Sequence, residues 1–336
     1  ERDQARFSAG VMNGRTTGAP IAIQIENRDY ENWRERDIRP MTIPRPGHAD
    51  LTGALKYGYR DLRLALERAS ARETAARVAV GGICQQLLKE FVVTVGSYVV
   101  LIGETAASIP GELSYPERFA LAEESDVRCP EAAGSEAMQA CIREAMAAKD
   151  TLGGIFEVVA LGLPPGLGSH VHWDRRLDAR LMAAVGSIQA IKGVEIGPAY
   201  ETAARRGTQV HDEILVQGGQ ILRPTNRAGG FEGGITTGQP IVVRAAMKPI
   251  STTLTPLRSV DLTNGEPTAT RYERSDTCAV SRAAIVGEGM AAFVLADALI
   301  EKLGGDGLHE MQRRFAALRR GQLTDLEMEN VAWRFT

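Results

Sequence analysis

The sequence lacks the features that mark several large classes of protein. Its four cysteines among 336 residues show no CxxC or other metal-ligand spacing, so we expect free thiols in a cytoplasmic chain, with neither disulfides nor a metal centre. The formal net charge is only −3, which excludes a generally basic surface for nucleic acid. No apolar run reaches 18 residues, since even residues 92–102 are interrupted by glycine and polar side chains, and we expect no membrane span.

Aromatic residues are also scarce, at 5%, whereas glycine contributes 35 residues, above its usual share of about 7%. These glycines form neither a G-x-G-x-x-G sequence after a strand nor a G-x-x-x-x-G-K-[ST] sequence. The dinucleotide fingerprint and the P-loop are therefore excluded. Any phosphate must be held in another way, and the glycine content favours close approach of backbone over contact with aromatic rings.

An internal repeat is the first positive signal. Residues 10–21 align without gaps to residues 230–241, and seven of the twelve positions are identical. The separation is too long for a solenoid period. We predict a duplicated β unit that forms a pseudo-twofold core within a single domain, 1–336, and the alternative is a chance Gly/Thr turn. Each copy leads into an alternating apolar strand, typical of half-buried antiparallel sheet: Ile21, Ile23 and Ile25 in the first, and Ile241, Val243 and Ala245 in the second.

The remaining periodicity indicates a mixed architecture. A capping box of Ser70 and Glu73 predicts the start of one helix. Because helices and strands do not alternate as βαβ units, we predict an α+β fold in which sheets pack against helices. Helices are predicted over residues 74–91, 135–149, 175–191, 283–303 and 308–319, and strands over 91–102, 155–161 and 193–196.

Arginine offers one way to hold an anion. Arg72 lies in the first turn of a predicted helix, where the helix dipole disfavours a cation. A phosphate or carboxylate between this guanidinium and the free N–H groups would make the arrangement favourable, and the alternative is a surface salt bridge. For Arg77, a pair with Glu73 is favoured. The other arginines of this cluster are Arg45, Arg60, Arg63 and Arg68, with Arg274 later in the chain.

Three further polar residues are candidates for a catalytic or phosphate-binding role. His48 stands in a turn beside an arginine and a carboxylate, although a turn histidine is often merely exposed. Asp276 precedes an apolar run, which fits a partly buried carboxylate with a tuned pKa or, alternatively, a helix cap or ion pair. Lys248 follows the strand of the second repeat and either closes on a phosphate with Thr252 or is a strand-end lysine.

Six segments, in order along nearly the whole chain, resemble the chorismate synthase family. The resemblance implies a carbon–oxygen lyase of the shikimate pathway that converts 5-enolpyruvylshikimate 3-phosphate to chorismate and phosphate by an anti-1,4-elimination. It also implies reduced FMN as cofactor without net redox change, NADPH as the reductant in some members, a homotetramer, and a β-α-β sandwich of antiparallel sheets with helices. The segments are 45–50 (Arg-Pro-Gly-His-Ala-Asp), 68–79, 191–197, 226–241, 247–252 (Met-Lys-Pro-Ile-Ser-Thr) and 274–280 (Arg-Ser-Asp-Thr-Cys-Ala-Val).

The resemblance also implies roles for individual residues. His48 would protonate or stabilise the reduced flavin, and Asp276 would act with flavin N5 in removing the C6 proton of the substrate. Substrate anions would be bound by Arg45, Ser70, Ala71, Arg72 and Arg274. Flavin would be contacted by His48, Arg63, Ser70, Ala71, Gln189, Ala190, Met247, Lys248, Thr252, Arg274, Ser275, Asp276 and Ala279.

The chain departs from the family pattern in two places. Members begin with a strand and a Gly-Glu-Ser-His-Gly motif that is absent here, so we expect the biological chain to begin upstream of Glu1. Many members also have a glycine-rich stretch where this chain has residues 64–67, which bears on the contacts of Arg63. A non-catalytic protein that binds flavin or a phosphometabolite is the alternative, and a flavin-independent phosphotransferase is disfavoured because no P-loop or magnesium-binding carboxylate pair is evident.

Overall fold

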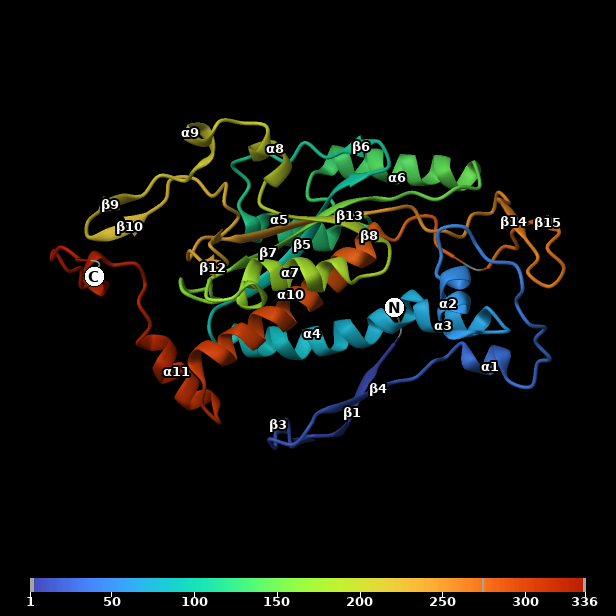
Figure 1. Ribbon diagram of the computed structural model, residues 1–336, viewed down its shortest axis with the longest axis horizontal. Helices are drawn as coiled ribbons and strands as arrows, with labels where there is room; N and C mark the ends of the chain where they lie inside the picture. The colour runs from blue at the N-terminus through green and yellow to red at the C-terminus, as the bar shows by residue number, and fades with distance from the viewer. Residues whose placement is uncertain (1–2, 274, 335–336) are drawn as a thin grey trace.

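A five-stranded antiparallel sheet forms the centre of the molecule. The computed structural model describes residues 3–273 and 275–334. Within them the strand order of this sheet is β6, β5, β7, β13, β8 (Figure 1). Every neighbouring pair is antiparallel, which confirms the predicted α+β class. The strands are β5 (Thr94–Ile102), β6 (Thr105–Ala106), β7 (Gly154–Leu161), β8 (Ile191–Ile196) and β13 (Ile241–Met247).

Three helices cover one face of the sheet: α4 (Thr74–Lys89), α7 (Leu177–Gly186) and α10 (Val280–Leu303) (Figure 1). The helix α10 is apolar on nearly all sides, as expected of a helix inside a core, and its Leu295 and Leu299 are fully buried. By length and composition, α10 alone among the described residues could cross a membrane, but 67% of its most apolar window is buried inside the molecule. We therefore assign α10 as the central core helix.

The opposite face of the sheet carries a row of polar side chains. Tyr98, Glu157, Arg244 and Glu195 are cross-strand partners on β5, β7, β13 and β8. Arg244 Nε donates to Glu157 Oε1 at 2.9 Å, and Arg244 Nη1 lies 3.3 Å from Glu195. Near β5 this face is covered by α5 (Tyr115–Glu124). Arg244 therefore links the two glutamates across the strands.

Both copies of the internal repeat fold into the same turn. The first glycine of each copy has a positive φ, +81° at Gly10 and +89° at Gly230. Its carbonyl accepts the N–H of the residue seven positions later, at 3.0 Å in the first copy and 2.9 Å in the second. A Cβ at either glycine would lie within 2.7 Å of a proline carbonyl oxygen, so both turns require glycine. Their short strands are β2 (Val11–Met12), β3 (Arg15–Thr16), β11 (Phe231–Glu232) and β12 (Ile235–Thr236).

The two copies differ in the strand after the turn, and here the structure departs from the predicted pseudo-twofold core. After the first copy, β4 (Ala22–Ile25) pairs, within the described part of the chain, only with β1 (Ala5–Ala9), whose five residues are all exposed. This hairpin extends away from the body of the molecule (Figure 1). After the second copy, β13 lies inside the sheet and contributes Ile241 and Val243 to the core. The same turn therefore leads into an exposed hairpin in the first copy and into the central sheet in the second.

All five predicted helices are present, with shifted ends, and the predicted strands are present as β5, β7 and β8. Shorter elements connect them and build the right-hand side of Figure 1, around α2, α3, β14 and β15. The elements not yet bounded are α1 (Tyr30–Trp33), α2 (Asp50–Tyr57), α3 (Arg63–Ala69), α6 (Ala132–Ala147), α8 (Ala199–Ala203), α9 (Gly207–Val210), α11 (Leu308–Ala316), β9 (Leu215–Gln217), β10 (Gln220–Leu222), β14 (Arg258–Val260) and β15 (Pro267–Ala269).

Candidate functional site

The loop of residues 44–50 is organised around one buried carboxylate. Asp50, the first residue of α2, is completely buried. Its oxygens accept from Arg45 three times, from the backbone N–H at 3.0 Å, from Nε at 2.9 Å and from Nη2 at 3.0 Å, and His48 Nδ1 lies 2.6 Å from Asp50 Oδ1. Burial acts to raise the pKa of Asp50, but the hydrogen bonds from His48 and Arg45 outweigh it and hold that pKa well below its usual range.

A second segment, residues 247–252, packs on this loop. Arg45 Nη1 donates to Thr252 Oγ1 at 3.1 Å, although the two residues are 207 positions apart. Lys248 Nζ donates to the Gly47 carbonyl, also at 3.1 Å. Burial lowers the pKa of Lys248, and repulsion from Lys192 lowers it further. Four of the predicted residues are thereby brought together: Arg45, His48, Lys248 and Thr252.

The end of α7 joins the same neighbourhood through Gln189 and Ala190. The Ala190 carbonyl accepts the Lys248 N–H at 2.9 Å, and Gln189 Nε2 donates to Glu73 at 2.7 Å. Ala190 has a φ of +66°, a left-handed conformation that is strained for a residue other than glycine and that clusters at ligand sites. Gln189 Oε1 is buried and has no partner among the described residues, so it is an acceptor that a bound molecule could satisfy.

The predicted capping box at Ser70 forms only in part. Ser70 Oγ accepts the Arg72 N–H at 3.2 Å and caps a 3₁₀ turn, Ala71–Glu73, that precedes α4. Glu73 turns away from Ser70 and instead pairs with Gln189 and with Arg77, at 2.8 Å in the latter case. Burial acts to raise the pKa of Glu73, but these hydrogen bonds bring it below its usual value. The pairing predicted for Arg77 is confirmed.

The two arginines predicted near the helix start have different surroundings. Arg72 Nη2 donates to the Glu26 carbonyl at 3.1 Å, and Arg72 Nη1 forms an ion pair with Asp3, which matches the salt-bridge alternative. Arg63 lies over the Trp33 ring, 5.8 Å from its centre. The Arg63 Nε atom is buried and without a partner among the described residues. Arg63 therefore carries a buried donor that a bound molecule could satisfy.

Asp276 is not the partly buried carboxylate that was one of the two sequence interpretations. Its side chain is 48% exposed and forms an ion pair with Arg282 of α10, so the ion-pair alternative holds. The carboxylate is held at the surface by Arg282, whose side chain is itself 63% exposed. Arg274, predicted to bind both substrate and flavin, lies outside the described residues.

The segment of residues 275–279 nevertheless adjoins residues 247–252. The Leu152 N–H donates to the Thr277 carbonyl at 2.8 Å, and the adjacent Gly153 is so close to Met247 that a Cβ there would lie 2.3 Å from the Met247 carbonyl oxygen. Strand β7 and the residues before it thus connect the two segments. Of the other predicted residues here, Ser275 is half-buried and Ala279 is the N-cap of α10.

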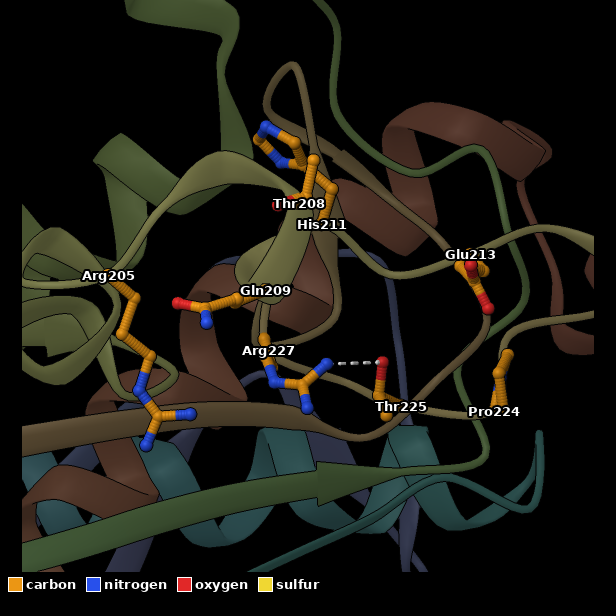
Figure 2. Close-up of a pocket in the computed structure, with 8 residues that line it drawn as sticks. All are labelled: Arg205, Thr208, Gln209, His211, Glu213, Pro224, Thr225 and Arg227. Atoms are coloured by element: carbon orange, nitrogen blue, oxygen red, sulfur yellow. Dashed lines mark hydrogen bonds between the residues drawn. The ribbon is translucent and has the colours of Figure 1, made fainter.

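A cavity of about 690 Å³ lies elsewhere, beside α9 (Figure 2). Arg205, Arg227 and Glu213 contribute charged groups to it, and Arg227 Nη1 donates to Thr225 Oγ1 at 3.2 Å. None of the predicted site residues that the structure describes lines this cavity, and of its lining residues only Arg227 falls within one of the six segments. No group of three His, Cys, Asp or Glu residues in the described part of the chain is arranged to hold a metal.

Comparison with known proteins agrees with the six motifs. Residues 1–300 match the family model for chorismate synthase. The chorismate synthase of Aquifex aeolicus (strain VF5) is 52% identical over 332 residues, covering 94% of this chain and 83% of the relative. That of Trichlorobacter lovleyi is 51% identical over 330 residues, covering 93% and 84%. A solved structure described as "Crystal Structure of Chorismate Synthase" is 46% identical, with a TM-score of 0.77, and the match covers 94% of this chain and 83% of that one.

Proposed function

The chain belongs to the chorismate synthase family, and on that premise we propose that it eliminates phosphate from 5-enolpyruvylshikimate 3-phosphate to give chorismate, at the site that includes Arg45, His48 and Lys248. The reaction makes the protein a lyase of aromatic amino-acid biosynthesis. Its substrate carries a phosphate and two carboxylates, which explains the need for cationic side chains in a chain of small net charge.

One observation carries the proposal. The 44–50 loop and residues 247–252, two of the family motifs, are held together by the Arg45–Thr252 and Lys248–Gly47 hydrogen bonds. Residues from a third motif region, Ser70 to Glu73, reach them through Gln189 and Ala190. Separate stretches of sequence therefore converge on one neighbourhood, as an active site built from several segments requires.

The residues present fit reduced FMN as the cofactor. Gln189 Oε1 is a buried acceptor and Arg63 Nε a buried donor, each lacking a partner among the described residues. Lys248 provides a cation suited to the phosphate of the cofactor, with Thr252 beside it. When bound, reduced FMN supplies electron density that helps the allylic phosphate to leave. We propose Gln189, Ala190, Met247, Lys248 and Thr252 as the residues that hold it, with a reductant such as NADPH.

The remaining roles are proposed from the same geometry. Asp276 would accept the C6 proton, because an exposed carboxylate can reach a substrate that lies over the segment 275–279. Ser70 and Ala71 would bind substrate or cofactor anions at the start of the 3₁₀ turn, with Arg72 and Arg274 beside them. We also propose the homotetramer and the cytoplasmic location of the family. Light scattering of the purified protein tests the assembly, and a monomer mass would refute it.

An anaerobic assay tests the proposed function. The natural polypeptide is mixed with chemically reduced FMN and 5-enolpyruvylshikimate 3-phosphate, and chorismate absorbance and free phosphate are followed together. We expect both products in equal amounts and no net oxidation of the flavin. A protein that only binds flavin would change the flavin fluorescence and release no phosphate, and this result would overturn the proposal.

A further inference from the structure

Asp50 is the buried group at the site to which neither the resemblance nor the sequence pattern assigns a role. Each of its two carboxylate oxygens has two nitrogen neighbours. One oxygen accepts the Arg45 backbone N–H at 3.0 Å and Arg45 Nε at 2.9 Å. The other lies 3.0 Å from Arg45 Nη2 and 2.6 Å from His48 Nδ1. A completely buried carboxylate needs such partners to stay ionised, and every one of them comes from its own loop.

The distances assign the proton on His48. Two atoms lie close to His48 Nδ1, the Asp50 oxygen at 2.6 Å and Arg45 Nη2 at 3.0 Å. If Nδ1 lacked a proton, its lone pair would face an ionised oxygen at 2.6 Å, which is repulsive. If Nδ1 carries the proton, it donates to Asp50 in a short charge-assisted hydrogen bond. The close approach of Arg45 Nη2 follows because both groups share the same oxygen.

Arg45 is engaged in this arrangement through all three of its guanidinium nitrogens. Each of its three guanidinium nitrogens has a partner, Nε and Nη2 at Asp50 and Nη1 at Thr252, and the residue is only 8% exposed. Its charge offsets that of the buried carboxylate. Arg45 therefore has a role inside the protein, holding the buried carboxylate, in addition to the substrate-binding role predicted for it.

We propose that Asp50, held by Arg45, is a positioning residue that fixes His48 with its proton on Nδ1 and leaves Nε2 as the atom that exchanges a proton with bound cofactor or substrate. His48 Nε2 has no hydrogen-bond partner among the described residues, and the His48 side chain retains 20% exposure. The charged groups facing this histidine are Asp50 and Arg45 from its own loop, with Lys248 bonded to the neighbouring Gly47. The catalytic consequence rests on the proposed function, whereas the proton position does not.

Asp50→Asn is the sharpest variant. The oxygen of the new amide would stay with the Arg45 N–H and Nε, because these are two donors against the single Arg45 donor at the other position, Nη2. The NH₂ group would then face His48 Nδ1. Since NH₂ only donates, Nδ1 must become an acceptor and the proton must move to Nε2. The variant thus keeps the size of the side chain and inverts the tautomer. In a serine protease triad the equivalent change lowers kcat about 10⁴-fold for this reason.

The tautomer is measured without any ligand. Protein labelled with ¹⁵N-histidine is recorded by long-range ¹H–¹⁵N correlation at about pH 9, where neutral imidazole predominates, with the His48 signals assigned by their loss in His48→Gln. We expect the Nδ1–H form in the wild type and the Nε2–H form in Asp50→Asn. A wild-type protein in the Nε2–H form overturns the proposal, even if the variant fails to fold.

Activity provides the second readout. We expect Asp50→Asn to lower kcat about 10²-fold or more while KM changes by less than about threefold. The matched control is Asp178→Asn, because Asp178 accepts Arg176 Nε at 3.1 Å, Arg176 Nη2 at 2.6 Å and a backbone N–H at 2.8 Å but faces no histidine among the residues described. Equal kcat losses in both variants would overturn the positioning role. If the tautomers behave as expected but the wild type forms no chorismate, only the proposed function fails.

Discussion

Replacing Gly81 by alanine should separate the two central helices. Gly81 lies inside α4, where it faces Gly289 of α10, and a Cβ at Gly81 would lie 2.2 Å from Gly289 Cα and 2.9 Å from its carbonyl carbon and oxygen. All three atoms are backbone, so no side-chain rotation can relieve the contact. A Cβ at the next residue, Gly82, would meet no atom within 4 Å. The two glycines therefore form a matched pair on the same helix.

The size of the effect follows from two opposing contributions. Alanine is favoured over glycine in a helix interior by about 0.8–1.0 kcal/mol, so Gly82→Ala should increase the free energy of unfolding by about that amount. Overpacking a core costs about 1–3 kcal/mol, and a backbone partner places Gly81→Ala at the upper end. After the gain in propensity, Gly81→Ala should lose about 2 kcal/mol, so that the variants differ by about 3 kcal/mol.

Urea unfolding followed by far-ultraviolet circular dichroism measures this difference, with all proteins at one concentration because the stability of an oligomer depends on it. We expect the midpoint to rise for Gly82→Ala and to fall for Gly81→Ala, with similar slopes. Equal midpoints for the two variants, or a Gly81→Ala variant at least as stable as the wild type, would refute the reasoning. Either result would mean that α4 and α10 do not meet at Gly81 and Gly289.

Four other outcomes are expected. His48→Ala and Asp276→Ala should each slow turnover about 10²-fold or more while FMN still binds in a fluorescence titration, and unchanged rates would contradict the proposed roles. Arg72→Ala should raise KM more than it lowers kcat, whereas an unaltered KM would count against an anion site there. Val92→Gly should stabilise the protein by about 1 kcal/mol, because Val92 lies just after α4 with a φ of +60° and is 83% exposed, and a lower urea midpoint would refute this. The depressed pKa of Asp50 stabilises the fold above its unfolded value of about 3.9, and this stabilisation is lost as pH falls through the folded value, so Asp50→Asn should unfold less steeply with acid. An unchanged acid profile would exclude Asp50 as a contributor.

Local features of the sequence were enough to locate the elements that depend on local interactions. The alternating residues of β13 predicted a strand with one buried face, and the structure shows this pattern. The repeat predicted one turn at two places because its glycines meet the same steric requirement in both copies. Periodicity failed at the start of α10, where Val280 to Arg282 also belong to the helix, because a helix buried on nearly all sides has no polar face to define its phase.

Long-range contacts decided what the sequence could not. Glu73 has the spacing of a capping box, but Gln189, 116 positions away, and Arg77 give its carboxylate two partners in place of one backbone N–H. No local rule predicts that choice. The sequence also did not predict which carboxylate is buried. From the sequence, Asp50 is one polar residue of a turn, and Asp276 is the better candidate for burial. The structure reverses the two, with Asp50 completely buried and the Asp276 side chain 48% exposed.

The hydrogen-bond and ion-pair partners of the arginines change which of them are the best candidates for binding a substrate anion. Arg45 and Arg77 are paired with Asp50 and Glu73, so part of the positive charge that the sequence concentrates here is already compensated. A substrate with one phosphate and two carboxylates must then be attracted by cations that are less completely paired. Arg63, whose buried Nε lacks a partner among the described residues, and Lys248, whose pKa is lowered by burial and by Lys192, are such cations. An anion beside Arg63 would satisfy a buried donor, and an anion beside Lys248 would offset the repulsion from Lys192. On this reasoning Arg63 is a stronger candidate for ligand binding than Arg45, the reverse of the order in which the motifs present them.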